Sequence, residues 1–451
     1  MNKMIHFADA DLKTLIAPEG HACACGRTHS MVMDYVSICP GAVKEIPAGL
    51  KAIGGTKPFI VCDENTKAAA WPFVEPVLAA AGIQYSLYCF PGAHIEPDEQ
   101  AMGSLAMAYD PSCDCIMGIG SGVINDCCKI MAKITGHKQM IVGTAPSMDG
   151  YASNSSAMIR DRIKVSIYDP SPAAIICDID IIKNAPMRML WAGFGDMLAK
   201  YIAICEWRIS NLVTGEYYCE NIADLMRASL RKIVENAPQL KTRDEKAVQA
   251  TVEGLVLSGV AMSYAGISRP ASGLEHYFSH LWEMMALDRG NSYELHGIQV
   301  GVGTLITLKL YDKIREMKPS REVAEKFIND FCDEEWQKMI RRIFGKAAET
   351  VIMQEHNQFH KNDKTRHAAR LTKILENWDE ILKIIDEELP DREAIAAIMK
   401  GLEMPMTPED INISWEDTCD AFIGSRDIRD KYLSSSMLWD MGVLYTTELP
   451  K

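Results

Sequence analysis

The stretch "CDCIMGIGSGVINDCCKIMAKITG" (113–136) indicates the fold class of this 451-residue chain. Its first part, 113–120, is a short apolar run that predicts a buried strand. Apolar residues then recur with the spacing of one helix face, at positions 124, 127, 128, 131 and 134. Gly118, Gly120 and Gly122 allow the backbone to turn tightly between the two. The stretch therefore predicts strand, turn and helix, which is half of a βαβ unit.

Further apolar runs continue this alternation at 58–63, 83–90 and 138–146, and a β-like passage follows at 160–182. Alternating strands and helices predict a mostly parallel sheet. Beyond about residue 185 the strand signals give way to helical periodicity. We therefore predict an α/β nucleotide-binding domain over 1–185 and an all-α domain over 186–451.

Composition and charge narrow the class of protein. The chain has 47 Lys and Arg against 61 Asp and Glu, a net charge of −14, and no long basic block, which argues against a nucleic-acid partner. No apolar run approaches the roughly 20 residues of a membrane span. The first 20 residues lack a signal-peptide pattern, and the 14 cysteines are spread through apolar stretches. We expect a reduced, cytoplasmic protein without stable membrane insertion.

Two segments receive no functional role from the sequence. "CACGRTH" (23–29) contains Cys23, Cys25 and His29, which could bind a metal. A Cys-x-Cys pair without a second pair is weak support for such a site, so an incidental or structural role is favoured. The histidines of "HNQFHKNDKTRH" (356–367), within the helical stretch 320–405, lie in polar surroundings that indicate an exposed linker.

The glycine turn and an acidic strand end favour a dinucleotide. The helix that begins after Gly122 offers N–H groups and a positive dipole end to an anion such as pyrophosphate. A strand–helix turn needs glycine in any case, and the spacing is not that of G-x-G-x-x-G. Asp63, at the end of the strand over 58–63, could bind a ribose diol and disfavour a 2′-phosphate, although Lys67 lies nearby. A helix cap is the alternative role for Asp63.

Histidines and a carboxylate are candidate metal ligands. His276 and His280 lie four residues apart in "SRPASGLEHYFSHLWEM" (268–284), and His296 follows. Asp196 lies in an apolar helical segment, where a buried carboxylate requires a cation, a donor or water. Catalytic zinc-type sites use three such ligands and keep one position open. Spacing alone leaves open whether these residues meet, and each has an ordinary structural alternative.

Six motifs carry a resemblance to a known family: "GSGVIND" (120–126), "TAPSMDGYAS" (144–153), "AGFGDMLAKY" (192–201), "SRPASGLEHYFSH" (268–280), "ELHG" (294–297) and "SRDIRDKY" (425–432). In this order they resemble the iron-containing, metal-dependent alcohol dehydrogenase superfamily, which includes glycerol dehydrogenase and dehydroquinate synthase. The resemblance is strongest to its bacterial-type sn-glycerol-1-phosphate dehydrogenases. It implies a dehydroquinate synthase-like fold, a homodimer or larger homo-oligomer, and a cytoplasmic role in phospholipid metabolism.

The resemblance also implies roles for individual residues. Asp196, His276 and His296 would bind one divalent metal, which is zinc, nickel, iron or manganese, and His280 would lie beside the substrate as a proton relay. Asp149 would contact the substrate hydroxyls and the nicotinamide end of NAD(H) or NADP(H). The implied cofactor positions are Gly120, Ser121, Gly122, Asp126, Thr144 and Ser147, to which we add Asp63 and Ser153 as candidates. Apart from the resemblance, Lys200 and Arg269 are candidate ligands of the substrate phosphate because each carries hydrogen-bond donors and a fixed charge, although Arg269 could equally form a structural ion pair.

Two departures from the superfamily pattern matter. Some members have a histidine four residues after the metal aspartate, where this chain has Lys200. That difference argues against the iron-type alcohol dehydrogenases and for a three-ligand site. The glycine turn also begins Gly-Ile-Gly where the family has Gly-Gly-Gly, which makes the local backbone less permissive.

The reaction implied is the NAD(P)H-dependent reduction of dihydroxyacetone phosphate to sn-glycerol 1-phosphate, with the metal polarising the carbonyl. One alternative keeps this chemistry but uses an unphosphorylated polyol, as in glycerol dehydrogenase. Another is a non-catalytic protein that binds a nucleotide or a metal on the same fold. The presence of all three candidate ligands, Asp196, His276 and His296, counts against this last alternative.

Overall fold

The computed structural model describes residues 4–92, 95–160 and 163–451, which fall into two compact units. Unit 1 comprises the chain up to Met197 together with Cys219–Pro270, and unit 2 comprises Leu198–Tyr218 and Ala271–Lys451. Within the described ranges, no helix combines the length and apolar character of a membrane span.

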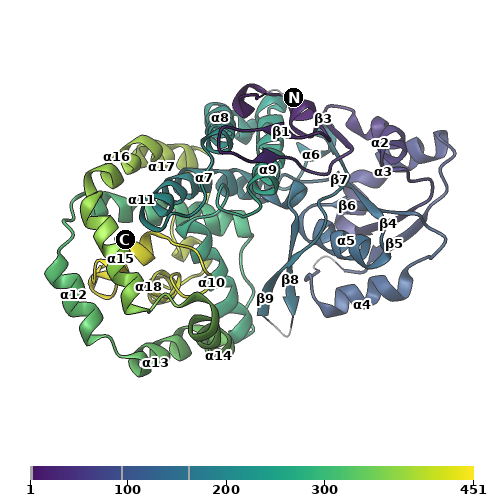
Figure 1. Ribbon diagram of the computed structural model, residues 1–451. Helices are drawn as coiled ribbons and strands as arrows, with labels where there is room; N and C mark the ends of the chain where they lie inside the picture. Colours follow the sequence, from purple (N-terminus) through teal and green to yellow (C-terminus); the bar gives the residue numbers. More distant parts are fainter. Residues whose placement is uncertain (1–3, 93–94, 161–162) are drawn as a thin grey trace. The chain divides into compact units, whose positions relative to one another are not determined.

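Unit 1 is built on a parallel sheet of six strands (Figure 1). The strand order is β3-β10-β7-β6-β4-β5, and every neighbouring pair is parallel. The strands are β3 (Tyr35–Cys39), β4 (Pro58–Asp63), β5 (Ser86–Phe90), β6 (Cys115–Gly120), β7 (Lys138–Gly143) and β10 (Ala174–Asp178). The α/β prediction is confirmed, and four of these strands lie in the runs from which they were predicted.

Two features of the sheet differ from the sequence prediction. The edge strand β3 was not predicted, because its short sequence "YVSIC" contains polar Ser37 and precedes the first clear apolar run. The β-like passage at 160–182 is not one element. Within it, β9 (Ile163–Tyr168) pairs antiparallel with β8 (Ser155–Arg160), β10 joins the main sheet, and the last four residues form the short helix α6 (Ile179–Ile182).

Helices cover both faces of the sheet because successive strand residues point to opposite sides. Ile60 and Cys62 of β4 pack in one core with α2 (Ile46–Ile53) and α3 (Glu64–Ala80). Phe59 and Val61 pack in the other core with α4 (Glu99–Ala108) and α5 (Gly122–Thr135). The 14 cysteines all lie in the described part of the chain, and none of them forms a disulfide.

Two helices beyond the predicted boundary belong to unit 1. They are α8 (Glu220–Asn236) and α9 (Glu245–Ala265), which pack against each other. α8 also contacts η1 (Phe7–Asp9), and α9 contacts η3 (Asp149–Ala152). The predicted domain boundary between residues 185 and 186 lies where strands give way to helices. It differs from the division into two compact units, in which α8 and α9 belong to unit 1.

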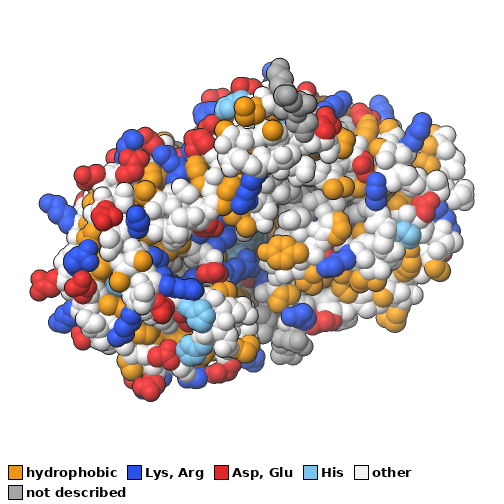
Figure 2. Space-filling view, viewed as in Figure 1, with side chains coloured by type: hydrophobic (Ala, Val, Ile, Leu, Met, Phe, Trp, Pro, Cys, Tyr) orange, Lys and Arg blue, Asp and Glu red, His pale blue; other side chains and the backbone are white. Residues whose placement is uncertain are grey.

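Unit 2 is helical, as predicted. It includes the part of α7 (Met187–Thr214) after Met197, and α10 (Leu274–Arg289) packs against α11 (His296–Arg315). The remaining α-helices are α12 (Arg321–Asp330), α13 (Asp333–Phe344), α14 (Ala348–Gln354), α15 (Lys364–Glu376), α16 (Trp378–Glu388), α17 (Arg392–Gly401), α18 (Trp415–Gly424) and α19 (Ser434–Asp440). Acidic and basic side chains are interspersed on the face of these helices seen in Figure 2.

The prediction of an exposed linker at 356–367 is wrong in part. His367 is buried, and its Nε2 lies 2.9 Å from the carbonyl oxygen of Asp440. Lys361 donates hydrogen bonds from Nζ to the carbonyls of Arg426 at 2.6 Å and Lys431 at 3.2 Å. Burial, with a contribution from the Arg426 charge, lowers the pKa of Lys361 to about 8. The polar composition of this stretch therefore reflects internal hydrogen bonding as well as solvent exposure.

A buried ion pair in unit 2 provides a test of stability. Arg370 donates from Nε and Nη2 to the two carboxylate oxygens of Asp440, both at 2.8 Å, and Asp440 is fully buried. Removing one partner of such a pair leaves an uncompensated charge, so Arg370→Met should lower the unfolding free energy by about 3 kcal/mol or more. Thermal or denaturant unfolding measures this loss. The Arg370→Met/Asp440→Leu double variant should be less destabilised than the single variant, and a greater loss would contradict the explanation.

Candidate metal, substrate and cofactor site

Three imidazole rings come together within unit 2. His276 and His280 lie one turn apart on α10, with His276 buried and His280 half-buried. His296 begins α11, and its ring centroid lies 5.3 Å from that of His276 and 5.4 Å from that of His280. The rings of His280 and His296 are stacked, with an interplanar angle of 21°. The packing of α10 on α11 therefore groups histidines that the sequence separates.

Buried acceptors lie behind two of these rings. Nδ1 of His276 is 2.7 Å from Oε1 of Glu275, and Nδ1 of His296 is 2.8 Å from Oγ of Ser279 and 3.3 Å from Oε1 of Glu283. A proton on each Nδ1 satisfies these acceptors and leaves Nε2 unprotonated, the form that binds a metal. The sequence analysis missed both glutamates. For Glu275 the available signal was its position directly before His276, whereas Glu283 lies 13 residues from His296 in the sequence and gave no comparable signal.

Unit 2 also contains a second possible ligand group. One ligand atom each from His280, Glu283 and His296 lies within 4.8 Å of the others. In this arrangement Glu283 would bind the metal directly and would not orient His296. The two roles for Glu283 predict different outcomes on mutation.

In unit 1, Asp196 anchors the loop that carries Asp149. Asp196 is fully buried on α7, and its Oδ2 accepts a hydrogen bond of 2.8 Å from the Asp149 backbone N–H. Ser258 on α9 donates to Oδ2 of Asp149 at 2.7 Å. The close approach depends on Gly193, because a Cβ there would lie 1.9 Å from the carbonyl oxygen of Pro146. Sequence reasoning identified Asp149 and Asp196 but missed Gly193 and Ser258.

Two ammonium groups reach the segment just before α10. Lys200 is fully buried and donates from Nζ to the carbonyl of Ala271 at 3.1 Å. Lys431 donates from Nζ to the carbonyl and to Oγ of Ser272, both at 3.1 Å. All four residues lie in unit 2. Arg269, the other predicted phosphate ligand, is buried in unit 1.

The glycine turn lies between β6 and α5, as predicted. A Cβ on Gly120 would lie 2.6 Å from Cβ of Ile124, so packing alone requires glycine there. At Gly122 the nearest atom would be Cγ of Met148 at 3.4 Å, which is an ordinary contact. Ser121 is the N-cap residue of α5 and makes no side-chain cap hydrogen bond. Packing therefore explains Gly120 but does not require glycine at Gly122, and the contact of both residues with a cofactor stays a prediction.

The other predicted cofactor residues, Thr144, Ser147 and Ser153, differ in burial and in hydrogen bonding. The backbone N–H of Thr144 donates to the carbonyl of Gly120 at 3.1 Å, and Ser147 is half-buried in the same loop. Ser153 is buried and donates from Oγ to the carbonyl of Ser155 at 3.0 Å. The hydroxyl of Ser153 thus holds the backbone of β8.

Asp126 has internal partners for both carboxylate oxygens. Oδ1 lies 2.7 Å from Nζ of Lys129, and Oδ2 accepts from the Ala157 backbone N–H at 3.1 Å. Burial raises the pKa of Asp126, and the charge of Lys129 opposes this shift. These contacts tie α5 to β8, so the structure gives Asp126 a role in the fold. Its direct contact with a cofactor stays a prediction.

Asp63 caps a helix, which is one of its two expected roles. Its Oδ1 accepts from the Thr66 backbone N–H at 2.8 Å, and Oγ1 of Thr66 accepts from the Asp63 N–H at 3.0 Å. This reciprocal capping box begins α3. The ribose contact of Asp63 stays a prediction.

The chain is similar in sequence to members of a known enzyme family. Residues 37–186 match the family described as iron-containing alcohol dehydrogenase. The chain is 33% identical over 293 residues to the NAD(P)+ glycerol-1-phosphate dehydrogenase of Halalkalibacterium halodurans, covering 64% of this chain and 73% of that one. It is 30% identical over 344 residues to the protein of the same name from Bacillus licheniformis, covering 74% and 86%.

This chain belongs to the glycerol-1-phosphate dehydrogenase family. The iron-containing alcohol dehydrogenase of Corynebacterium glutamicum has a similar fold, with a TM-score of 0.57, 13% identity and coverage of 92% of this chain and 98% of that one. The family assignment confirms the resemblance found in the sequence motifs. The roles of individual residues remain predictions.

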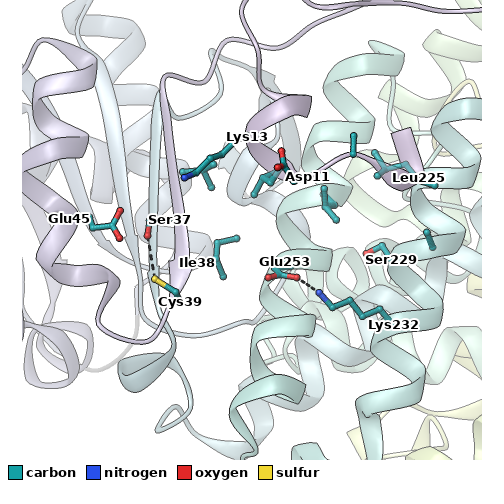
Figure 3. Close-up of a pocket in the computed structure, with 16 residues that line it drawn as sticks. Asp11, Lys13, Ser37, Ile38, Cys39, Glu45, Leu225, Ser229, Lys232 and Glu253 are labelled. Atoms are coloured by element: carbon teal, nitrogen blue, oxygen red, sulfur yellow. Dashed lines mark hydrogen bonds and ion pairs between the residues drawn. The ribbon is translucent and has the colours of Figure 1, made fainter. Parts of the chain in front are cut away.

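A cavity of about 660 Å³ in unit 1 lies apart from the residues that the family resemblance singles out (Figure 3). It is bordered by the residues just after η1, by β3, and by α8 and α9. Its polar lining includes Asp11, Lys13, Glu45 and an ion pair between Lys232 and Glu253. None of its lining residues is a predicted site residue, and we assign the cavity no role.

Proposed function

We propose that this chain is an NAD(P)-dependent oxidoreductase that interconverts dihydroxyacetone phosphate and sn-glycerol 1-phosphate. The observation that carries this proposal is the 33% identity along 73% of a relative named for that activity. The motifs at 144–153 and 268–280 support it. The likeness to the C. glutamicum enzyme, at 13% identity, supports the fold alone. A homo-oligomeric, cytoplasmic enzyme of phospholipid metabolism stays a prediction.

We propose further that Asp196, His276 and His296 hold one divalent metal. The acceptors behind Nδ1 of both histidines support this assignment, as does the burial of Asp196 in the apolar helix α7. When bound, the metal supplies a Lewis acid that polarises the substrate carbonyl. Oxygen and imidazole donors of this kind accept zinc, nickel, iron or manganese.

His280 and Asp149 are the proposed catalytic residues. A histidine titrates near neutral pH, and His280 is only half-buried, so its ring can exchange a proton with solvent and deliver it to the product oxygen. Stacking on His296 holds the ring in place. The hydrogen bond from Ser258 orients the Asp149 carboxylate, which we propose contacts the substrate hydroxyls and the nicotinamide end of the cofactor.

A phosphorylated substrate is favoured by cationic residues. Lys200 and Lys431 converge on the Ala271–Ser272 backbone, and both can supply charge-assisted hydrogen bonds to a phosphate. We keep Arg269 as a further phosphate ligand. The cofactor pyrophosphate is proposed to bind at the N-terminus of α5, over Gly120, Ser121 and Gly122, with Thr144 and Ser147 lining the cofactor site.

An assay that compares two substrates tests the function. Metal-stripped protein should not oxidise NADH in the presence of dihydroxyacetone phosphate, and adding zinc, nickel, iron(II) or manganese back should restore turnover. The product should be the sn-1 stereoisomer of glycerol phosphate. Turnover of dihydroxyacetone equal to that of its phosphate would replace this proposal with a polyol dehydrogenase. No NADH oxidation with any of these metals and a panel of ketones would leave a non-catalytic binding protein.

The Asp63 prediction can be tested without disturbing the helix cap. Asp63→Ser removes the carboxylate but keeps a good N-cap residue for α3. If the carboxylate binds the ribose diol, the NADP(H)-to-NAD(H) ratio of kcat/KM should rise by about tenfold, because a charged hydrogen-bond partner is lost. Steady-state kinetics with both cofactors measures the ratio. An unchanged ratio at unchanged Tm would restrict Asp63 to capping.

A further inference from the structure

A cluster of three sulfur atoms and one imidazole lies in unit 1, apart from the proposed catalytic residues. Cys23 and Cys25 lie in the turn between β1 (His21–Ala22) and β2 (Thr28–His29). His29 is the last residue of β2. Cys219 is the N-cap residue of α8. One ligand atom from each of Cys23, Cys25, His29 and Cys219 lies within 4.8 Å of the others. We propose that these four residues bind a structural zinc ion.

Two of three distances within the cluster fall in the range of a tetrahedral zinc site, and the third is about 0.3 Å shorter. Nε2 of His29 lies 3.2 Å from Sγ of Cys25 and 3.6 Å from Sγ of Cys219, and the sulfur atoms of Cys23 and Cys219 are 3.6 Å apart. With Zn–S bonds of about 2.3 Å and Zn–N bonds of about 2.0 Å, neighbouring ligands of a tetrahedral zinc lie about 3.5–3.8 Å apart. A disulfide requires an S–S distance of about 2.05 Å, so the Cys23–Cys219 spacing suits a shared metal better than a covalent bond.

The imidazole of His29 is oriented for metal binding. Its Nδ1 lies 2.9 Å from the carbonyl oxygen of Tyr264, which can only accept a hydrogen bond. The proton must therefore be on Nδ1, which leaves Nε2 as the ligand atom facing the sulfur atoms. Tyr264 stacks on the same ring, and Phe7 packs edge-on against it. These contacts bury His29 and fix the orientation of its ring.

The backbone of the β1–β2 turn holds the two neighbouring cysteines. Cys23 donates from its N–H to the carbonyl of Arg27 at 3.0 Å, and Gly26 donates to the carbonyl of Cys23 at 3.0 Å. Gly26 has φ +84°, a conformation that favours glycine. Asn221 on α8 donates from Nδ2 towards Sγ of Cys23 at 3.9 Å. The turn and the start of α8 therefore position the thiols of Cys23 and Cys219.

Zinc is the metal favoured by this donor set, and the site is of the structural kind. Three thiolates and one imidazole form a complete Cys₃His shell, with no open position for substrate. The site would join the β1–β2 hairpin to α8, across 196 residues of sequence between Cys23 and Cys219. Sequence analysis gave Cys23, Cys25 and His29 no metal role because it could not identify Cys219 as their partner.

Cobalt substitution tests this site independently of the proposed enzyme activity. Reduced protein is stripped with a chelator, loaded with Co²⁺, and examined for the near-ultraviolet band that only thiolate-to-cobalt charge transfer produces. The proposed Asp196, His276 and His296 site contains no sulfur and cannot give this band. Wild-type protein and His276→Ala should therefore both show it, even though His276→Ala loses turnover. Wild-type protein loaded with zinc should contain two ions per chain and His276→Ala one.

Matched variants identify the residues that give rise to the charge-transfer band. Cys219→Ser and Cys25→Ser should lose it together with one zinc ion and show a lower Tm, whereas Cys332→Ser, at an exposed cysteine, should keep both ions. His29→Cys should keep the band, because a site of four thiolates also binds zinc. Retention of the band in this variant would show that a substitution within the cluster does not by itself unfold the protein. A wild-type protein without the band, or retention of the full band in Cys219→Ser, would each overturn the proposal.

Discussion

Replacing His276 with alanine is expected to remove the proposed divalent metal and to lower turnover of dihydroxyacetone phosphate by at least about 10³-fold. A Lewis acid contributes several kcal/mol to stabilising the charge that develops on the substrate oxygen, and about 4 kcal/mol corresponds to that factor. The side chain is buried and its ring is oriented by Glu275, as expected of a metal ligand. Metal analysis and steady-state kinetics on the same samples measure both losses.

Two further variants make this test specific. Glu275→Gln keeps the size of the side chain but weakens the acceptor behind His276, so metal affinity should fall by about 10–100-fold while the fold is retained. His356→Ala removes an exposed histidine that pairs with Asp333, and it should leave metal content and turnover unchanged. A His276→Ala protein with full metal content and turnover would refute the ligand assignment.

Replacing His280 with alanine should leave the metal bound while kcat falls by about 10²–10⁴-fold, the usual contribution of a positioned acid or base. The pH–rate profile should also lose the limb that reports the His280 imidazole, because the side chain proposed to carry the proton is absent. Metal content, kcat and the pH profile together distinguish this role from a merely structural one, since altered packing alone would leave the profile of the residual activity unchanged.

Loss of metal from His280→Ala would instead identify His280, Glu283 and His296 as the ligand set. Glu283→Gln provides a second measurement of this question. If Glu283 only orients His296, the variant should bind metal about 10–100-fold more weakly, whereas removal of a direct ligand should abolish binding. The two arrangements therefore predict different results for two separate variants.

The sequence predicted the parallel α/β unit and the helical unit because local periodicity is strong in both. It placed β4, β5, β6 and β7 correctly, since each is an apolar run bounded by turn residues or a helix. It missed β3, whose short run is broken by Ser37, and whose membership of the sheet depends on pairing with β10, more than a hundred residues away. It also separated α8 and α9 from unit 1, because an amphipathic pattern does not specify the surface that buries it.

Helical spacing alone determined that His276 and His280 share a face, and the order of the motifs determined the family. Only the tertiary structure brought His296 beside them, put Glu275 and Glu283 behind the rings, and joined Cys219 to Cys23, Cys25 and His29. The reason is physical. The α-helix repeats every 3.6 residues whatever surrounds it, whereas contacts between distant segments depend on how whole elements pack.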